Sequence, residues 1–267
     1  MSWASYKKGF KAFLQLEKSL SEHSIEAYLR DIDKLTNYLE TQGASISPSE
    51  VTLEHLQASI RCIGDMEMAP TSQARILSGI KSFFKYCLLE QICTVNPTTL
   101  LPSPKTRRKL PDVLSFEEIE QLISYIDVSK PEGGRNRAML ETMYSSGLRV
   151  TELIELKISC LYLDLGYIRV IGKGNKERVV PIGIPAARAL DNYLKSGRAS
   201  FANSKSANAV FLGSRGKRID QRLAREVVYD AMSAIGSEMG PHGLRHTAAT
   251  HLLEGGADLR KIGRAHV

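Results

Sequence analysis

Residues 241–256 read PHGLRHTAATHLLEGG, and the spacing of their apolar side chains predicts a helix that ends at the two glycines. The expected core-facing stripe consists of Leu244, Ala248, Ala249, Leu252 and Leu253. His242 and Arg245 stand three residues apart, which places both side chains on one face of such a helix, opposite that stripe. An imidazole that transfers protons beside a guanidinium that binds anions indicates a phosphate site.

Two further stretches bring related chemistry to the same half of the chain. Residues 145–156 read SSGLRVTELIEL, in which Arg149 follows a glycine that breaks the preceding helix, and Glu152 lies three residues further on the same face. Residues 167–182 read YIRVIGKGNKERVVPI, two β-branched runs around a glycine-rich turn, which predicts a hairpin with Lys173 at its tip. Two arginines, a lysine and a histidine all bind or protonate phosphates, which is consistent with phosphoryl transfer without a metal.

Three boxes in this order, SGLRVTEL, IGKGNKERVVPI and HGLRHTAATHLL, resemble the signature boxes of the tyrosine recombinases, or phage integrases, and most closely those of the bacterial Xer enzymes. The resemblance covers nearly the whole chain. It implies that Arg149 and Arg245 are the two catalytic arginines and that Glu152 orients the first of them. It also implies that Lys173 is the hairpin lysine and that His242 is the first catalytic histidine.

The resemblance implies a site-specific DNA recombinase. In this family a tyrosine hydroxyl attacks the scissile phosphate, forms a 3′-phosphotyrosyl enzyme and releases a 5′-hydroxyl, and strand exchange reverses these steps. The expected partner is a double-stranded DNA recombination site, bound by a homo- or hetero-tetramer on two such sites, with no cofactor. The role is chromosome dimer resolution or integration of a mobile element, and the residues do not distinguish these two.

The C-terminal residues depart from the family pattern. In the family, a segment that begins ADLR leads into a box with a second histidine or tryptophan, and then to the nucleophilic tyrosine. Here residues 257–267 read ADLRKIGRAHV, and no tyrosine follows Tyr229. We therefore expect the catalytic domain to be incomplete at its C-terminus and the chain as given to lack its nucleophile. The alternatives are a non-catalytic DNA-binding fragment and a tyrosine donated by a neighbouring subunit.

The expected fold is mainly α-helical with a small antiparallel β-hairpin or sheet, in two domains. Residues 1–99 predict four helices, which the resemblance identifies as a SAM-like DNA-binding domain. Residues 112–267 predict the α+β catalytic domain. The 36 Lys+Arg exceed the 29 Asp+Glu, and this excess lies after residue 99, which favours a polyanionic partner for the later part of the chain.

The linker between the domains, residues 100–111, reads LLPSPKTRRKLP. Its prolines favour an extended backbone, and its positive charges are suited to crossing a groove while touching phosphates. Lys105, Arg107 and Arg108 are therefore expected to contact DNA. The alternative is a hinge that is merely solvated.

The first domain offers a second candidate DNA-binding surface. Its helices are expected to begin after Ser21, at Thr52 and after Pro70, and the second of the four is expected to stop at Gly43. The outer side of the last of these helices carries a polar and basic stripe suited to a duplex backbone, formed by Ser72, Arg75, Ser78, Lys81 and Lys85. An ordinary solvated face is the alternative interpretation.

The second domain is expected to open with a capping box between Ser115 and Glu118. Further helices are expected near 135–145, 150–156, 185–195 and 220–235, with a loop at 196–208 and a short strand at 210–212. Further cations expected to face DNA phosphates are Arg215, Lys217, Arg218, Arg222 and Arg225.

Several side chains have a second interpretation. Arg149 is a possible salt-bridge partner of Glu152 rather than a phosphate ligand, and Lys176 competes with the hairpin lysine for its role. His246 and His251 fall on other helix faces than the candidate catalytic histidine, so we expect them to pack or to form hydrogen bonds.

The cysteines and the hydropathy bear on the class of protein, namely on metal sites, compartment and membrane spans. The four cysteines show no CxxC spacing, which predicts reduced thiols in a cytoplasmic protein and no metal site. No apolar run approaches the ~20 residues of a membrane span. A metal-dependent nuclease or phosphodiesterase is a third function class, but no cluster of metal ligands supports it.

Overall fold

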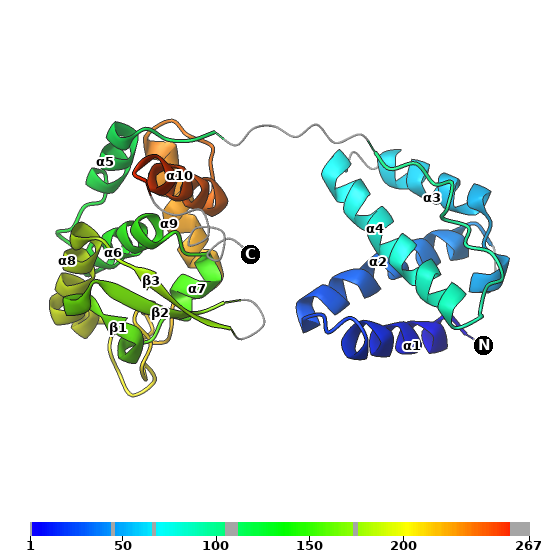
Figure 1. Ribbon diagram of the computed structural model, residues 1–267, viewed down its shortest axis with the longest axis horizontal. Helices are drawn as coiled ribbons and strands as arrows, with labels where there is room; N and C mark the ends of the chain where they lie inside the picture. The colour runs from blue at the N-terminus through cyan, green and yellow to red at the C-terminus, as the bar shows by residue number, and fades with distance from the viewer. Residues whose placement is uncertain (1, 44–45, 66–67, 105–111, 173–175, 257–267) are drawn as a thin grey trace. The chain divides into compact units, whose positions relative to one another are not determined.

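The computed structural model of the protein describes residues 2–43, 46–65, 68–104, 112–172 and 176–256. It divides into two compact units, Met1–Lys109 and Leu110–Val267 (Figure 1). Lys105, Arg107 and Arg108 of the predicted linker lie outside the described residues, as does Lys173 of the predicted hairpin turn. Leu101 is buried in the core of the first unit, so this core extends beyond residue 99.

The described part of the first unit contains the helices α1 (Trp3–Leu16), α2 (Glu22–Thr41), α3 (Leu53–Asp65) and α4 (Pro70–Leu89), with a 3-10 turn, η1 (Pro48–Glu50). The predicted signals set their ends. The hydroxyl of Ser21 accepts a hydrogen bond from the backbone N–H of Ser24 and so caps α2. Gly43 follows that helix with a φ of 69°, and Pro70 occupies the first turn of α4.

Aromatic side chains of α1 and α4 fill the core of the first unit. Phe10 meets Phe83 edge-on at 5.3 Å between ring centroids, and both rings are fully buried. Trp3 stacks on Phe83 and donates from its indole nitrogen to the carbonyl of Ile46 at 2.8 Å. The start of α1 is thereby fixed to the segment between α2 and α3.

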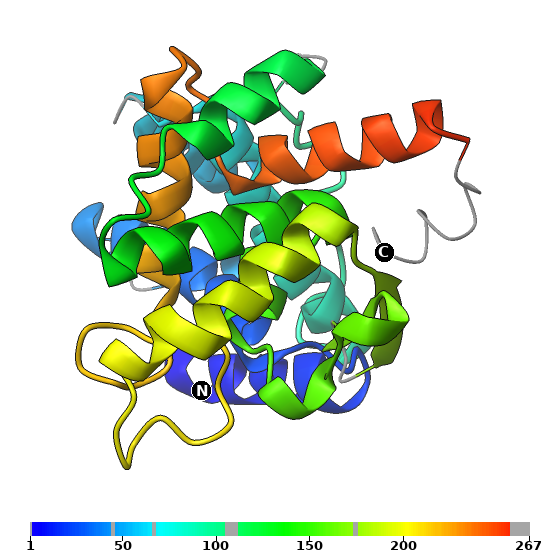
Figure 2. The same ribbon diagram turned by 90° about the vertical axis from the view of Figure 1, so that its left-hand side faces the viewer.

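The second unit combines helices with a three-stranded antiparallel sheet, which confirms the predicted fold class. Its described helices are α5 (Phe116–Ser124), α6 (Pro131–Ser146), α7 (Val150–Ile154), α8 (Ile184–Asn192), α9 (Gln221–Ala234) and α10 (Pro241–Glu254). Short turns are η2 (Ile158–Cys160), η3 (Leu163–Leu165), the π-helical η5 (Tyr193–Gly197) and η6 (Arg198–Ser200). The capping box of α5 forms as predicted between Ser115 and Glu118. α8 and α10 both pack against α6 (Figure 2).

The sheet has the order β1 (Leu161–Tyr162), β2 (Tyr167–Ile171) and β3 (Glu177–Pro181). The predicted hairpin is formed by β2 and β3, whose register pairs Val170 with Arg178. The backbone N–H of Gly172 donates to the carbonyl of Lys176 at 2.8 Å and closes the hairpin before its turn. Strand alternation directs Val170 and Val180 into the core.

Two predicted elements of the second unit are wrong in detail. The strand expected at 210–212 is replaced by isolated bridges, because its backbone groups bind separate partners: Val210 N–H donates to Leu156 at 3.1 Å, and Leu212 N–H to the Tyr193 hydroxyl at 3.2 Å. The helix expected to reach residue 195 ends as α-helix at Asn192 and continues as the π turn η5.

The buried face of α10 also differs from the prediction. Leu244 and Ala248 are buried, but Leu252 and Leu253 are 36% and 39% exposed. Arg245 is only 5% exposed and lies on the buried side rather than opposite it. A cationic side chain is tolerated there because the carbonyl oxygen of Gly147 and the carboxylate of Glu152 lie beside it. No helix in the described part of the chain has the length and apolar content needed to cross a membrane.

Candidate active site

The end of α6 supplies the first part of the site. Gly147 terminates this helix in the left-handed conformation, with φ 55° and ψ 38°, and the N–H of Leu148 returns to the Met143 carbonyl at 3.2 Å. The carbonyl oxygen of Gly147 accepts a hydrogen bond from Nη1 of Arg245. The predicted helix break therefore places a backbone acceptor where the α10 arginine needs one.

α7 begins directly after this turn and adds Arg149 and Glu152. The Glu152 carboxylate accepts from the backbone N–H of Arg149 at 2.9 Å (Oε2) and from its Nη1 at 3.0 Å (Oε1). The salt bridge considered as an alternative role for Arg149 is therefore present. It does not exclude phosphate binding, because a guanidinium carries five N–H donors in a planar fork and the Arg149 side chain is 27% exposed.

Arg178 on β3 is part of this site, although the sequence motifs did not predict it. Its Nη1 donates to Glu152 Oε1 at 2.8 Å and its Nη2 to Glu152 Oε2 at 2.9 Å. Strand periodicity carries the signal that could have found it. Arg178 alternates with the outward-facing Glu177 and Val179 and shares the face of the buried Val180, so an inward-facing arginine needs an acidic partner.

Arg245 completes the cluster from α10. Its Nη1 lies 3.6 Å from Glu152 Oε2, in addition to its bond to the carbonyl at the end of α6. Burial lowers the pKa of the Arg245 guanidinium to about 10, and the positive charge of Arg149 acts in the same direction while Glu152 opposes it. The side chain therefore remains charged at neutral pH.

Glu152 is the common partner of these three arginines. Burial by itself raises the pKa of the Glu152 carboxyl, but hydrogen bonds from Arg178 and from the Arg149 backbone outweigh it, so the pKa lies below its ordinary value. Within the described ranges, three guanidiniums surround this one ionised carboxylate. We define this arginine cluster as Arg149, Glu152, Arg178 and Arg245.

The other two predicted catalytic residues of the second unit, His242 and Lys173, are not part of this cluster in the described structure. His242 lies in the first turn of α10, one turn before Arg245, and its side chain is exposed. Lys173 would follow Gly172 at the end of β2, but it lies outside the described residues. Lys176, the alternative candidate for the hairpin lysine, is exposed. The structure thus brings together the two arginines and the glutamate of the prediction, and adds Arg178.

His251 packs and forms a hydrogen bond, as predicted for it. Its Nδ1 lies 2.7 Å from the Tyr144 hydroxyl, and its ring stacks on Phe116 at 4.0 Å between centroids. It therefore ties α10 to α6 and α5.

Some of the additional cations have acidic partners. Arg218 pairs with Glu155, and Arg222 pairs with Glu226 at 2.8 Å. The exposed side chains of Arg215, Lys217 and Arg225 remain candidates for DNA contacts.

The predicted DNA-binding stripe of the first unit contains one structural ion pair. Arg75 donates to Asp31 through Nη1 at 2.9 Å and through Nη2 at 2.6 Å, and Asp31 is almost fully buried. Ser78 and Lys85 are exposed, whereas Ser72 and Lys81 are partly buried and Lys81 lies 3.4 Å from the Ser103 hydroxyl.

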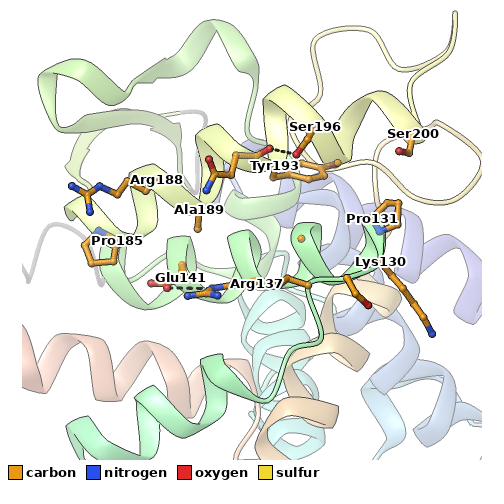
Figure 3. Close-up of a pocket in the computed structure, with 15 residues that line it drawn as sticks. Lys130, Pro131, Arg137, Glu141, Pro185, Arg188, Ala189, Tyr193, Ser196 and Ser200 are labelled. Carbon is orange, nitrogen blue, oxygen red and sulfur yellow. Dashed lines mark hydrogen bonds and ion pairs between the residues drawn. The ribbon is translucent and has the colours of Figure 1, made fainter.

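The second unit also contains a pocket of about 660 Å³ that lies apart from the arginine cluster. It is lined mainly by α6, α8 and η5, and includes Arg137, Glu141 and Arg188 (Figure 3). Arg137 and Glu141 approach each other to 4.0 Å across one side of it. No residue of the arginine cluster lines this cavity, so the cluster forms a separate site.

No group of three or more His, Cys, Asp or Glu side chains within the described ranges could hold a metal ion. The four cysteines, Cys62, Cys87, Cys93 and Cys160, form no disulfide in this structure, and the last three are buried.

Sequence models of known families match both units. The model for the phage integrase family matches residues 112–266, more than half of the 267 residues, and the model for the phage integrase N-terminal SAM-like domain matches residues 8–91. The chain belongs to the phage integrase family. Both matches agree with the prediction made from the three boxes.

This phage integrase family member has curated relatives among the Xer recombinases. Tyrosine recombinase XerD of Staphylococcus epidermidis is 39% identical over 255 residues, which cover 94% of this chain and 85% of the relative. XerD of Listeria innocua is 38% identical over 260 residues, or 95% of this chain and 86% of the relative. XerC of Mycobacterium sp. (strain JLS) is 38% identical over 259 residues, with the same coverage.

Solved structures of an integrase and of two recombinases share the fold. A λ integrase (75–356) dimer bound to a COC′ core site has a TM-score of 0.76 at 17% identity and covers 98% of this chain and 93% of its own. XerH bound to palindromic difH substrate, in a post-cleavage complex, has a TM-score of 0.76 at 20% identity, with 97% and 77% covered. XerA recombinase has a TM-score of 0.52 at 25% identity, with 98% and 88% covered.

Proposed function

We propose that this protein is a site-specific DNA recombinase of the Xer type, which cleaves and rejoins DNA strands through a 3′-phosphotyrosyl intermediate. The observation that carries the proposal is the arginine cluster, because three guanidiniums converge on one buried carboxylate from α7, β3 and α10. Guanidiniums held in place in this way stabilise the negative charge that develops on a phosphate in the transition state. The Xer relatives and the order of the three boxes support the same assignment.

In the proposed reaction Arg149 and Arg245 bind the two non-bridging oxygens of the scissile phosphate. The tyrosine oxygen forms a bond to phosphorus as the bond from phosphorus to the 5′ oxygen breaks, and the proton of the tyrosine hydroxyl passes to a base of the site or to solvent. Lys173 gives a proton to the leaving 5′ oxygen, and His242 assists by hydrogen bonding or proton transfer. Rejoining reverses each step, so the reaction conserves the phosphodiester bond energy without ATP.

The proposed partner is double-stranded DNA carrying a recombination site. Both units are proposed to contact it, the first through Ser72, Lys81 and Lys85 and the linker through Lys105, Arg107 and Arg108. The λ integrase structures include a dimer on a core site and a tetramer on a Holliday junction. We propose a homo- or hetero-tetramer on two sites for this chain, acting in chromosome dimer resolution or in integration of a mobile element.

The nucleophile distinguishes two versions of the proposal. The last tyrosine of the 267 residues is Tyr229 on α9, so the segment after α10 supplies none. Cleavage of DNA by the chain requires a tyrosine that acts on the scissile phosphate, whatever its source. If none is supplied, the chain acts as a non-catalytic DNA-binding protein, which is the alternative function.

A joining assay tests phosphate activation separately from the source of the tyrosine. Duplexes that the chain binds are first selected from a pool with a random central segment. The selected duplex is then made with a nick, with a 3′ p-nitrophenyl phosphodiester on one side and a 5′-hydroxyl on the other. Joining forms the bond between phosphorus and the 5′ oxygen and releases p-nitrophenolate, while the hydroxyl proton passes to the protein or to solvent.

A recombinase is expected to seal the nick at one position and to release an equal amount of p-nitrophenolate. Selected binding without joining would contradict the catalytic proposal and favour the alternative. If no sequence is enriched in the selection, both versions fail. A covalent protein–DNA adduct on a nicked duplex with an ordinary phosphodiester would show, in addition, that a tyrosine is supplied.

A further inference from the structure

The orientation of the Glu152 carboxylate depends most directly on Arg178. Arg178 contacts both carboxylate oxygens in a two-point arrangement, at 2.8 and 2.9 Å. Arg149 also reaches both oxygens, but through two separate groups: its backbone N–H donates to Oε2 at 2.9 Å and its Nη1 to Oε1 at 3.0 Å. Arg245 approaches Oε2 only to 3.6 Å. One planar guanidinium that meets both oxygens fixes the plane of a carboxylate more firmly than separate contacts from a backbone N–H and a side chain do.

Burial makes this arrangement rigid. The Glu152 side chain is 3% exposed and that of Arg178 is 18% exposed. A buried carboxylate that loses a partner of this kind keeps its desolvation cost with fewer compensating contacts, which favours its reorientation or protonation. Either change would alter the positions of Arg149 and Arg245, because both are held against the same carboxylate.

Arg178 also joins the cluster to the hairpin turn. A Cβ atom placed on Gly172 would lie 3.0 Å from Arg178 Nη1 and 3.7 Å from Glu152 Oε1. The ion pair therefore packs directly on the residue that precedes Lys173 in the sequence. The strand carries Arg178 at the register position opposite Val170, so the base of the hairpin and the ion pair form one unit.

We propose that Arg178 is a positioning residue of the recombination site, which holds Glu152 and through it sets the geometry of Arg149 and Arg245. It acts through the carboxylate and is not required to touch the phosphate. This inference rests on the proposed function for its catalytic consequence. Its structural consequence, the orientation and ionisation of Glu152, does not depend on that function.

The first test compares R178A and R178K with R169A, a control on the neighbouring strand β2 whose arginine pairs with Glu177 at 3.6 Å instead. On the selected nicked duplex, R178A is expected to lower the joining rate by ~30-fold with duplex affinity nearly unchanged, as for other residues that orient a ligand-binding side chain. R178K keeps the charge but loses the two-point contact, so its rate is expected to lie between those of wild type and R178A. R169A should match the wild type.

A double-mutant cycle with E152Q shows whether Arg178 acts through the carboxylate. If it does, R178A lowers joining much less in the E152Q background than in the wild-type background. Equal losses in both backgrounds would overturn the proposal, because Arg178 would then act independently of Glu152. Circular dichroism establishes that each variant is folded, and R178K replaces R178A in the cycle if R178A does not fold.

A second measurement needs no catalytic activity. The carboxyl carbon of Glu152 is titrated by NMR in the wild type and in R178K and R178A. Of the residues that the structure describes, the charged groups that face this carboxyl are Arg149 at the start of α7, Arg178 from β3 and Arg245 from α10. Removal of Arg178 is therefore expected to raise the Glu152 pKa markedly.

An unchanged titration would overturn the positioning role even if the wild-type protein joins DNA. If the wild type joins no duplex while the titration shifts as expected, the proposed function fails and the structural role of Arg178 stands. The two failures are therefore distinguishable.

Discussion

Arg245 donates a hydrogen bond from Nη1 to the carbonyl oxygen of Gly147, across 98 positions of sequence. This contact joins the start of α10 to the end of α6, at the residue whose left-handed backbone turns the chain toward α7. The position of one candidate catalytic arginine is thus set by the same turn that leads into the other, Arg149. The backbone conformation of a single glycine therefore affects the geometry of the whole cluster.

Gly147→Ala is expected to destabilise the second unit by about 1–2 kcal/mol, because a side chain disfavours the left-handed conformation that has φ 55° here. It should also slow joining, since the carbonyl that holds Arg245 must move. Gly134→Ala in the same helix is the matched control. A Cβ there meets no atom within 4 Å, so this change should leave stability unchanged or raise it by about 0.5–1 kcal/mol. Thermal unfolding followed by circular dichroism measures both, and equal effects would contradict the role assigned to Gly147.

Glu152 should make the second unit sensitive to acid. Its folded-state pKa lies below the ordinary value of 4.5, so its ionisation stabilises the folded state above that pH, and the contribution is lost as pH falls through the folded-state pKa. E152Q is therefore expected to cost about 3 kcal/mol at neutral pH, and less as pH falls below 4.5. Urea unfolding of both proteins across this range tests it. A cost that stays constant with pH would show that the charge of Glu152 does not matter to folding.

Arg75 should act on the stability of the first unit. Asp31 is 1% exposed, and burial raises the pKa of its carboxyl while the hydrogen bonds from Arg75 oppose that rise. R75A is expected to destabilise the unit by about 2 kcal/mol, since it leaves a buried carboxyl without its two-point partner. Trp3 is the single tryptophan and packs in this unit, so its fluorescence reports the unfolding of the first unit. An unchanged midpoint in urea would show that the ion pair is energetically neutral.

Lys85 lies on α4, as Arg75 does, but we expect it to affect DNA binding and not stability. It is exposed, and its replacement by alanine should change stability by less than about 0.5 kcal/mol. If the outer side of α4 contacts the DNA backbone, K85A should weaken binding to all duplexes alike and reduce the slope of log affinity against log salt by about 1. Binding of the selected duplex at several salt concentrations measures this. An unchanged slope would remove Lys85 from the proposed interface.

Local signals explain why much of this fold could be predicted. Ser21, Pro70 and the capping box at Ser115 act over a few residues, and strand alternation around Gly172 predicts the hairpin directly. These features depend on neighbouring side chains and backbone geometry, which the sequence displays. The predicted pairing of Arg149 with Glu152 belongs to the same class, since the two lie within one helical turn.

Contacts between distant residues explain what the sequence did not show. Arg178 reaches Glu152 across 26 positions and Arg75 reaches Asp31 across 44, so neither partner is evident from spacing. The stripe predicted on α10 fails at Leu252 because helical periodicity does not show how far neighbouring elements extend along a helix. Long-range packing, rather than local propensity, decided each of these cases.

The most direct test of the central claim is the rate of p-nitrophenolate release on the selected nicked duplex, for wild type and for R149A, R245A and R245K. The arginine cluster predicts sealing by the wild type and losses of ~100-fold or more in both alanine variants, with the duplex still bound. R245K keeps the positive charge in case R245A does not fold, and it should also be strongly impaired because it loses the guanidinium geometry. Sealing at wild-type rates by folded R149A and R245K would contradict the claim that this cluster activates the phosphate.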